Sequence, residues 1–212
     1  MSGPFQGMHY PVSPAEGCYV PRLLGCYEQE LHPWIEDIGR HPYDVVIDVG
    51  CAEGYYAIGF ARLMPQCRVF AFDTNEVARS KCLQMAAGNG VAERVTVGTL
   101  FDAEAMERIP GGRRLLFCDI EGAEAELLDP ARIPGLAQTD VIVETHPAFV
   151  PGILDTIAQR FASTHAMEIV EPTLCRTIPL AFVRAWPEIQ QLAAVWEMRG
   201  APTPWVRLTA RR

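Results

Sequence analysis

Apolar and polar positions alternate in blocks along the middle of the chain. Short apolar runs of strand length are separated by stretches in which apolar residues recur every three or four positions. The first pattern is typical of buried strands and the second of amphipathic helices. The predicted strands are residues 43–49, 68–73, 94–97, 114–119 and 140–144. The predicted helices are residues 55–64, 76–87, 103–109, 123–128 and 153–163.

This regular alternation of strand and helix predicts βαβ units and a parallel sheet. The alternation stops after residue 163, where strands over 167–170 and 206–209 flank an irregular stretch and a helix over 187–196. We expect these two strands to form an antiparallel pair that completes the sheet. The pattern therefore predicts an α/β, Rossmann-like fold with a mostly parallel, seven-stranded sheet flanked by helices.

The first 40 residues follow a different pattern. Residues 1–20 are rich in proline, glycine and aromatic side chains, which predicts an irregular segment, either a surface arm or a lid over a site. Residues 21–40 have helical spacing, and Pro33 in their middle predicts a break into two helices.

Length and composition fit one globular domain. The chain has 212 residues, of which 49% are hydrophobic and 21% charged. We expect a single domain over 1–212, in which residues 1–40 form an arm and helix and residues 43–210 the Rossmann-like core. The net charge of −8 argues against nucleic acid as a partner, because phosphate binding needs a clustered basic surface.

Targeting signals and cysteine usage bear on location. No apolar stretch is long enough to span a bilayer, and the N-terminus lacks the pattern of a signal peptide. None of the seven cysteines has C-x-x-C spacing, and several lie in apolar runs, where we interpret them as core residues. These observations predict a cytoplasmic protein that has no membrane partner.

The segment from Asp48 to Gly54 carries the first chemical signal, because it follows a predicted strand and precedes a predicted helix. Its sequence, D-V-G-C-A-E-G, has Gly50 and Gly54 four positions apart, which is not the G-x-G-x-x-G spacing of dinucleotide-binding proteins. The spacing resembles motif I of class I methyltransferases, which implies that Cys51 and the neighbouring backbone contact S-adenosylmethionine. Glu53 either faces the ammonium group of this cofactor or caps the helix. A tight turn of another Rossmann-like protein is the alternative.

Asp73 and Thr74 carry the second signal, at the end of the second predicted strand. A carboxylate in this place can accept hydrogen bonds from both ribose hydroxyls of an adenosyl group. The two residues also precede a predicted helix, so Asp73 is a candidate N-cap as well.

The third signal is the segment D-I-E-G-A-E at 119–124, followed by E-T-H at 144–146. Together with Asn89-Gly90-Val91, Arg199 and Trp205, these segments resemble the FkbM family of methyltransferases, over roughly residues 43–210. The resemblance implies a methyltransferase fold, S-adenosylmethionine as cofactor, and O-methylation of a small hydroxylated molecule such as a sugar or secondary metabolite.

Four titratable residues lie at the carboxyl ends of the fourth and fifth predicted strands, namely Asp119, Glu121, Glu144 and His146. In one interpretation His146 is the general base, with Glu144 or Asp119 orienting it. In the other, Asp119, Glu144 and His146 bind a divalent metal such as Mg²⁺ or Mn²⁺ that lowers the pKa of the acceptor. Structural roles are the alternative: Asp119 as a cofactor contact, Glu121 and Glu124 as a solvated first helical turn, and His146 as a turn residue.

Two other classes of function compete with methyl transfer. A nucleotide-dependent oxidoreductase is disfavoured by the missing third glycine, and a cofactor-binding protein without transferase activity retains the same motifs. The acceptor is expected to be a small molecule recognised by residues 1–40 and 171–204, where we find no motif. We expect a homodimer only because two-fold dimers are the commonest assembly of such enzymes.

Overall fold

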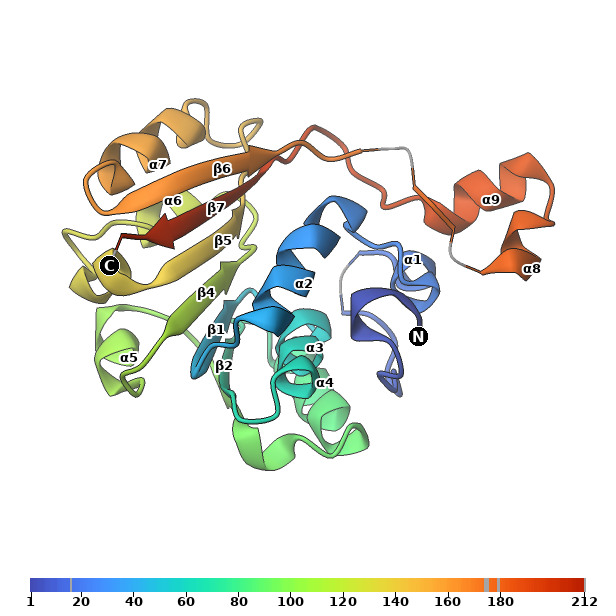
Figure 1. Ribbon diagram of the computed structural model, residues 1–212, viewed down its shortest axis with the longest axis horizontal. Coiled ribbons are helices and arrows are strands. Elements are labelled where there is room, and N and C mark those ends of the chain that lie inside the picture. Colours follow the sequence, from blue (N-terminus) through green and yellow to red (C-terminus); the bar gives the residue numbers. More distant parts are fainter. Residues whose placement is uncertain (16, 174–175, 179, 212) are drawn as a thin grey trace.

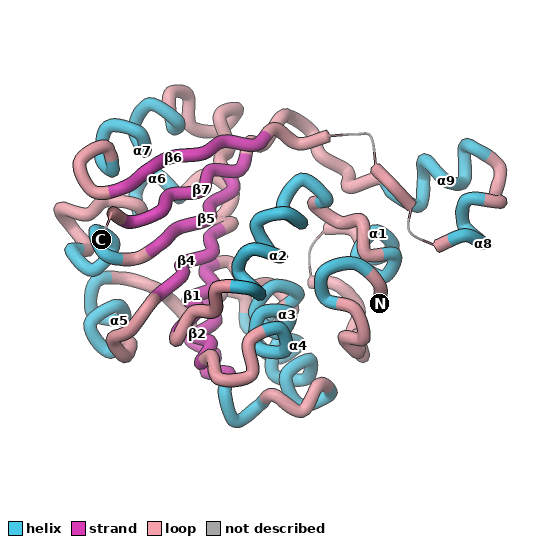
Figure 2. Tube along the Cα trace, viewed as in Figure 1, coloured by secondary structure: helices cyan, strands magenta, loops and turns pink. Residues whose placement is uncertain are grey.

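One seven-stranded sheet organises the molecule (Figures 1 and 2). The computed structural model describes residues 1–15, 17–173, 176–178 and 180–211. The sheet order is β3-β2-β1-β4-β5-β7-β6; the first five strands are parallel, and β7 is antiparallel to both of its neighbours. The strands are β1 Val45–Val49, β2 Arg68–Phe72, β3 Val95–Gly98, β4 Arg114–Cys118, β5 Asp140–Glu144, β6 His165–Val170 and β7 Trp205–Ala210. The predicted Rossmann-like fold is confirmed, and the strand ends fall within about two residues of those predicted.

Helices cover both faces of the sheet (Figure 1). Helices α2, α3 and α4 lie on one face, whereas α5, α6 and α7 lie on the other. The helices are α1 Tyr19–Leu24, α2 His32–Arg40, α3 Tyr55–Leu63, α4 Glu76–Gly88, α5 Ala103–Arg108, α6 Glu124–Leu127, α7 Ile153–Phe161, α8 Ala181–Arg184 and α9 Glu188–Val195. Short 3-10 turns span Gly3–Phe5, Gln29–Leu31, Ala92–Arg94 and Pro134–Gln138.

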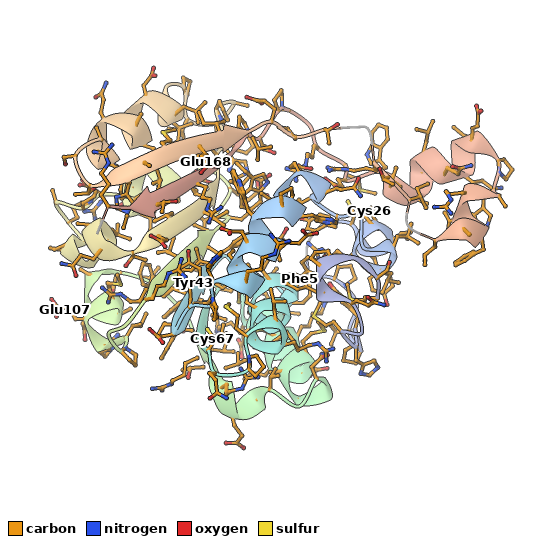
Figure 3. All side chains as sticks on the ribbon, viewed as in Figure 1. Phe5, Cys26, Tyr43, Cys67, Glu107 and Glu168 are labelled. Atoms are coloured by element: carbon orange, nitrogen blue, oxygen red, sulfur yellow. The ribbon has the colours of Figure 1, made fainter. Side chains whose placement is uncertain are left out.

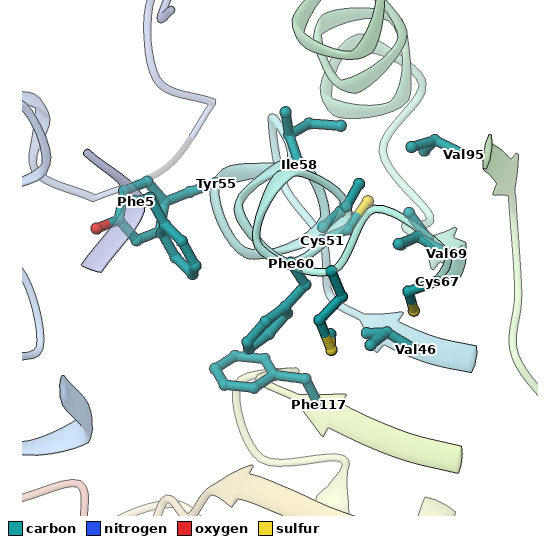
Figure 4. Packing of buried hydrophobic residues seen from close by; sticks show 14 of the residues in the cluster. Phe5, Val46, Cys51, Tyr55, Ile58, Phe60, Cys67, Val69, Val95 and Phe117 are labelled. Atoms are coloured by element: carbon teal, nitrogen blue, oxygen red, sulfur yellow. The ribbon is translucent and has the colours of Figure 1, made fainter. Parts of the chain in front are cut away.

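The two faces of the sheet form two apolar cores. Every residue of β1 is buried, with Val46 facing one core and Ile47 the other. This two-sided burial explains why the parallel strands appear as continuous apolar runs in the sequence. Phe60 of α3 packs on Phe117 of β4 in the first core, with ring centroids 5.7 Å apart (Figure 4).

Charged side chains lie mostly outside these cores. Glu107 and Glu168 are exposed, whereas Phe5 and Cys67 are buried (Figure 3). Within the described part of the chain, the cysteines are free and buried, as their interpretation as core residues predicts; the seventh, Cys175, lies outside the described residues.

The N-terminal arm, residues 1–18, packs as part of the first core. Phe5 and Met8 are buried, and the ring of Phe5 meets Tyr55 edge-on at 5.3 Å between centroids. The helix predicted over 21–40 is indeed divided, but Pro33 is not the cause. Pro33 lies in the first turn of α2, where a proline is tolerated, and the chain breaks at Gly25, whose φ of +70° ends α1.

Residues 171–204 leave the sheet after β6 and return at β7. They carry α8 and α9, which project to one side of the molecule beyond α1 (Figure 1). Val183 and Ala194 on their inner side pack against Leu24 and Cys26, while Phe182 and Ile189 are exposed. Among the described residues, no helix is both long and apolar enough to cross a membrane.

Candidate active site

The carboxyl ends of the parallel strands bring the three sequence signals to one edge of the sheet. Val49 at the end of β1 pairs in register with Phe72 of β2 and with Cys118 of β4. The residues that follow these strands, Gly50, Asp73 and Asp119, therefore emerge side by side. Ligands of open α/β sheets bind at this edge.

The loop after β1 depends on its glycines. Gly50 has a φ of +82°, and a Cβ atom there would lie 1.7 Å from the backbone oxygen of Asp119. Gly54 has a φ of +93° and is the N-cap of α3, and a Cβ would lie 2.8 Å from the Sγ atom of Cys82. The first glycine thus lets the loop pass close to the end of β4, and the second lets α3 pack on α4.

Asp48 lies buried beneath this loop. Its side chain is almost inaccessible, and its Oδ2 atom has no hydrogen-bond partner among the described residues. Burial raises the pKa of Asp48 to about 7. The loop therefore lies over a desolvated carboxyl group, whose charged form is disfavoured by burial.

Asp73 holds the loop from the side. Its Oδ2 atom accepts a hydrogen bond from the backbone N–H of Ala52 at 2.8 Å, and its Oδ1 atom accepts one from Asn75 at 2.8 Å. The interpretation of Asp73 as an N-cap is wrong, because the side chain of Asn75 caps α4 by accepting from Val77 and Ala78. Each carboxylate oxygen of Asp73 keeps a further lone pair that can accept from a ribose hydroxyl.

Two cavities meet at Gly50. The first, of about 680 Å³, is lined by the β1 loop, the ends of β4 and β5, and residues 197–203, which we call the roof. The second, of about 820 Å³, is lined by Asp73, exposed Thr74 and apolar side chains that include Phe101. Gly50, Asp119 and Glu121 line both cavities, so one elongated ligand can lie across the β1 loop and reach into each.

His146 stands at the centre of the first cavity's polar side chains. Its Nδ1 atom lies 2.6 Å from Oε1 of Glu124, a fully buried carboxylate. Its Nε2 atom lies 3.7 Å from Oε2 of Glu144, 3.8 Å from Oδ1 of Asp119 and 3.8 Å from Oε2 of Glu121. The structure thus brings together all four titratable residues singled out in the sequence.

The neighbouring carboxylates change the proton affinity of His146. Burial lowers its pKa, but the hydrogen bond and charge of Glu124, with the charges of Glu144 and Glu121, outweigh burial and raise it. For Glu124, burial raises the pKa, but the hydrogen bonds from His146 and from backbone N–H groups, together with the charge of His146, outweigh burial and lower it. Burial, followed by the charges of Glu144 and Glu28, raises the pKa of Asp119.

Glu124 is a residue of this cluster whose place could not be predicted from the sequence. The interpretation of Glu124 as part of a solvated helical turn is wrong, because none of its side chain is exposed. The expectation that Glu144 or Asp119 orients the imidazole is also wrong, since Glu124 holds Nδ1. Glu121 is 69% exposed and reaches the cluster from the rim.

The roof closes the first cavity through Arg199. This side chain donates to Glu144, to Glu28 at 2.9 Å and to Glu197 at 3.1 Å. Thr203 also donates to Oε1 of Glu144, at 2.7 Å. The other oxygen of Glu144 is thereby turned toward His146.

Glu53 is fully buried at the end of the β1 loop. Its carboxylate accepts hydrogen bonds from the hydroxyl of Tyr10 and from the backbone N–H of Ala15 at 2.8 Å, and forms an ion pair with Arg22. The interpretation of Glu53 as a helix cap is wrong, because Gly54 occupies the N-cap. Its contact with a cofactor ammonium stays a prediction. Arg22 could not be placed at the site from sequence, because its segment carries no motif. Arg199 belongs to the resemblance described above, but nothing in the sequence assigned it to the site.

Comparisons with known proteins support the fold. No protein-family model matches the chain, and no curated protein matches its sequence. An O-methyltransferase of Bacillus cereus in complex with SAH has a TM-score of 0.57 at 13% identity, over 95% of this chain and 83% of that one. The O-methyltransferase TomG of Streptomyces achromogenes in complex with SAM has a TM-score of 0.54 at 13% identity, over 92% of each chain. A precorrin-6Y C5,15-methyltransferase of Geobacter metallireducens gives 0.53 at 15% identity, over 78% of this chain and 80% of that one. The chain therefore has the Rossmann-like fold of methyltransferases.

Proposed function

We propose that this protein is an S-adenosylmethionine-dependent O-methyltransferase of a small hydroxylated molecule, such as a sugar or secondary metabolite. The observation that carries the proposal is the meeting of two cavities at Gly50, one beside Asp73 and the other around His146. Two of the structures with this fold are O-methyltransferases in complex with SAH or SAM. The resemblance to the FkbM family points to the same chemistry.

In this proposal the cofactor lies along the β1 loop. Its adenosyl group occupies the second cavity, where Asp73 accepts from the ribose hydroxyls and apolar side chains such as Phe101 surround the adenine. Its sulfonium lies over Gly50, and its amino-acid part enters the first cavity. Asp119 lies where the two cavities meet, beside the methyl group to be transferred.

The acceptor then lies in the remaining space of the first cavity, between the methyl group and His146. Nε2 of His146 would take the proton of the acceptor hydroxyl. The cofactor, when bound, would supply an electrophilic methyl group to the acceptor oxygen and leave as S-adenosylhomocysteine. Glu124 keeps the proton of the neutral imidazole on Nδ1, so that the lone pair of Nε2 faces the acceptor. Burial excludes water from this base.

The same cluster suits a divalent cation. Ligand atoms of Asp119, Glu144 and His146 lie within 4.8 Å of one another, and Oδ1 of Asp119 is buried without a hydrogen-bond partner among the described residues. Two carboxylates and an imidazole are ligands that Mn²⁺ accepts, and Mg²⁺ would use the oxygens. A bound cation would lower the pKa of the acceptor hydroxyl. In that arrangement Nε2 of His146 would hold the metal, and a different group would receive the proton.

The proposal includes a small-molecule acceptor, no nucleic acid or membrane partner, a cytoplasmic location and a homodimer. The alternatives remain a cofactor-binding protein without transferase activity and an oxidoreductase. The unpartnered Oδ2 of Asp48 beneath the loop favours a cationic cofactor over NAD, since a positive charge above it stabilises the ionised carboxyl.

Calorimetric titration of the protein with S-adenosylmethionine tests the proposal. We expect micromolar binding, no binding of NAD, and an affinity about 10- to 100-fold lower for Asp73→Ala, because two hydrogen bonds to a charged group are lost. Acceptors are then screened by mass spectrometry with EDTA, Mg²⁺ or Mn²⁺. Binding of NAD in place of S-adenosylmethionine would contradict the proposed function, and activity that survives EDTA would exclude the metal.

A further inference from the structure

Helices α8 and α9, with the residues just after them, expose large apolar side chains. The two helices project from the body of the molecule beyond α1 (Figure 1). Six such side chains, which we call the hairpin patch, are exposed by 39% to 75%: Phe182, Trp186, Ile189, Leu192, Trp196 and Met198. Clustered apolar exposure of this extent marks an interaction surface.

Helix α9 turns its larger apolar residues away from the molecule. Ala194 is buried, in the small core that also contains Leu24 of α1. Ile189, Leu192 and Trp196 recur at intervals of three and four positions, the spacing of one side of a helix, and all three are exposed. Folding of a single chain would favour the opposite arrangement, because burial of leucine or isoleucine is more stabilising than burial of alanine.

Helix α8 adds two aromatic side chains to the patch. The rings of Phe182 and Trp186 meet edge to face, with 6.0 Å between their centroids. Gln191 of α9 donates to the backbone oxygens of Arg184 at 3.1 Å and Trp186 at 2.8 Å, which ties the two helices together. Aromatic side chains present roughly 150–250 Å² each, so the exposed parts of the six side chains together approach the ~800 Å² that each partner of a standard interface buries.

The charges of the two helices cancel. Arg184 and Glu188 are the only charged residues in the segment 180–196, and both are exposed. Arg184 uses one of its five N–H donors on the backbone oxygen of Ile178, at 3.1 Å. The net charge of −8 therefore comes from the rest of the chain, and two copies can meet at this surface without facing a surplus of negative charge. In a two-fold dimer each contact occurs twice, so Arg184 of one copy and Glu188 of the other can form two ion pairs.

We propose that the hairpin patch is the surface through which two copies of this chain associate about a two-fold axis. The inference assigns a surface to the expected homodimer and holds whichever reaction the candidate site carries out. A bilayer is a poorer occupant, because helices that lie on membranes carry lysine and arginine on their polar face. The polar residues of α9 are Glu188, Gln190 and Gln191, none of which is basic.

The patch reaches the candidate active site through Met198. This side chain is 75% exposed, and it also lines the first cavity as part of the roof. The next residue, Arg199, donates to Glu144. A second copy seated on the patch would cover the outer side of Met198 and thereby support the roof over the cavity.

Size-exclusion chromatography with light scattering, applied to the full chain at several concentrations, tests the proposal. We expect the wild-type protein to be a dimer at about 10–50 µM. For Ile189→Gln/Leu192→Gln we expect the dissociation constant of the dimer to rise at least about 100-fold, because apolar contacts are lost in both copies. Circular dichroism is expected to match wild type, since both side chains are exposed. The matched control is Val77→Gln/Leu83→Gln, two exposed positions of α4 outside the patch, which we expect to remain dimeric.

Charge reversal tests whether the partner is a second copy. Arg184→Glu places like charges opposite each other twice, and we expect the dissociation constant to rise about 10-fold or more. Arg184→Glu/Glu188→Arg restores opposite signs between identical copies, and we expect association to recover.

Three results would overturn the inference. The first is a wild-type protein that stays monomeric up to about 100 µM, which would leave the patch to another protein. The second is a dimer that persists in Ile189→Gln/Leu192→Gln or fails to recover in the double charge reversal. The third is a monomer that sediments with phosphatidylglycerol vesicles, which would assign the patch to a bilayer.

Discussion

At the scale of the residue, the pairing of His146 with Glu124 decides the proposed chemistry. The sequence placed His146 near three acids, and the structure confirms that they surround its Nε2 atom. The acid on Nδ1 could not be identified, because Glu124 lies in a segment predicted to be an exposed helical turn. In the structure Glu121 and Gly122 both have a positive φ, of +53° and +106°, and Glu124, two residues after this turn, is buried.

This pairing predicts a change in the titration of one histidine. The Glu124 carboxylate stabilises the imidazolium form of His146, so Glu124→Gln is expected to lower the pKa of His146. The measurement is an NMR titration of the imidazole protons, with Glu126→Gln, an exposed acid of the same helix, as the control. An unchanged midpoint in Glu124→Gln would contradict the pairing.

The same ion pair also predicts how stability depends on pH. His146 holds its proton more tightly when folded, so its contribution is fully present below the ordinary histidine pKa and is lost as the pH rises through the raised value. The pKa of Glu124 is lowered, so its contribution is present above the ordinary carboxyl pKa and is lost as the pH falls. The pair is therefore strongest in mildly acidic solution.

Gly50 gives a second prediction at this scale. Gly50→Ala adds a Cβ atom 1.7 Å from the backbone oxygen of Asp119, so the β1 loop must move away from β4. We expect the free energy of unfolding to fall by more than about 3 kcal/mol. We also expect the variant to lose S-adenosylmethionine binding. Gly152→Ala is the control. Gly152 also has a positive φ, but no atom of the residues that the structure describes lies within 4 Å of its Cβ position, which limits the cost to about 1–2 kcal/mol. Equal losses in urea unfolding would argue against the close approach.

At the scale of the element, apolar runs were sufficient to find the strands, because both faces of β1, β4 and β5 are buried. Helix ends were harder to place. Asp73 and Asn75 stand two residues apart before α4, and either side chain is chemically able to cap it. The hydrogen bond from Ala52 draws Asp73 toward the β1 loop and leaves the cap to Asn75.

The separate roles of Asp73 in the β1 loop and Asn75 as the cap of α4 can be tested. Asn75→Ala removes the hydrogen bonds to Val77 and Ala78, and we expect a loss of about 1 kcal/mol of stability. Binding of S-adenosylmethionine is expected to stay within about twofold of wild type. Thermal unfolding and calorimetric titration measure the two effects, and a large loss of affinity would show that Asn75 takes part in cofactor binding.

At the scale of the whole molecule, buried carboxyl groups gather at one edge of the sheet. Burial raises the pKa of Asp48 to about 7, and burial together with the charge of Glu144 raises that of Glu28 to about 8. Both groups bind protons more tightly in the folded chain than in the unfolded chain. Their contribution to stability is fully present below the ordinary carboxyl pKa and is lost as the pH rises through these values.

We therefore expect the protein without ligand to be less stable at pH 9 than at pH 6, by on the order of 1–3 kcal/mol. Urea unfolding at several pH values measures this difference. Asp48→Asn, which removes one of the two groups without changing its shape, is expected to flatten the dependence. A stability that rises from pH 6 to pH 9 would contradict the assignment of proton-holding carboxyls.

The fold and the cofactor loop were predictable, but the walls of the first cavity were not. The β1 loop could be recognised from a few consecutive residues, because the spacing of its glycines reflects the local backbone geometry. Arg22 and Arg199 reach the site from opposite parts of the chain, and each contact depends on the packing of the whole molecule. Arg199 also donates hydrogen bonds to Glu28 and Glu197, and no local sequence pattern predicts these contacts.

The position of β7 has a consequence for how the protein is made. Among the described residues β6 pairs only with β7, and β7, although it is synthesised later, lies between β6 and β5. During translation β6 has no hydrogen-bonding partner in the sheet until β7 leaves the ribosome, whereas β1 to β5 already have theirs. The roof, residues 197–203, directly precedes β7 in the chain. A nascent chain can thus form the β1 loop, which contacts the proposed cofactor, well before the roof can close the first cavity around an acceptor. The pairing of β7 completes both the sheet and the closure of this cavity.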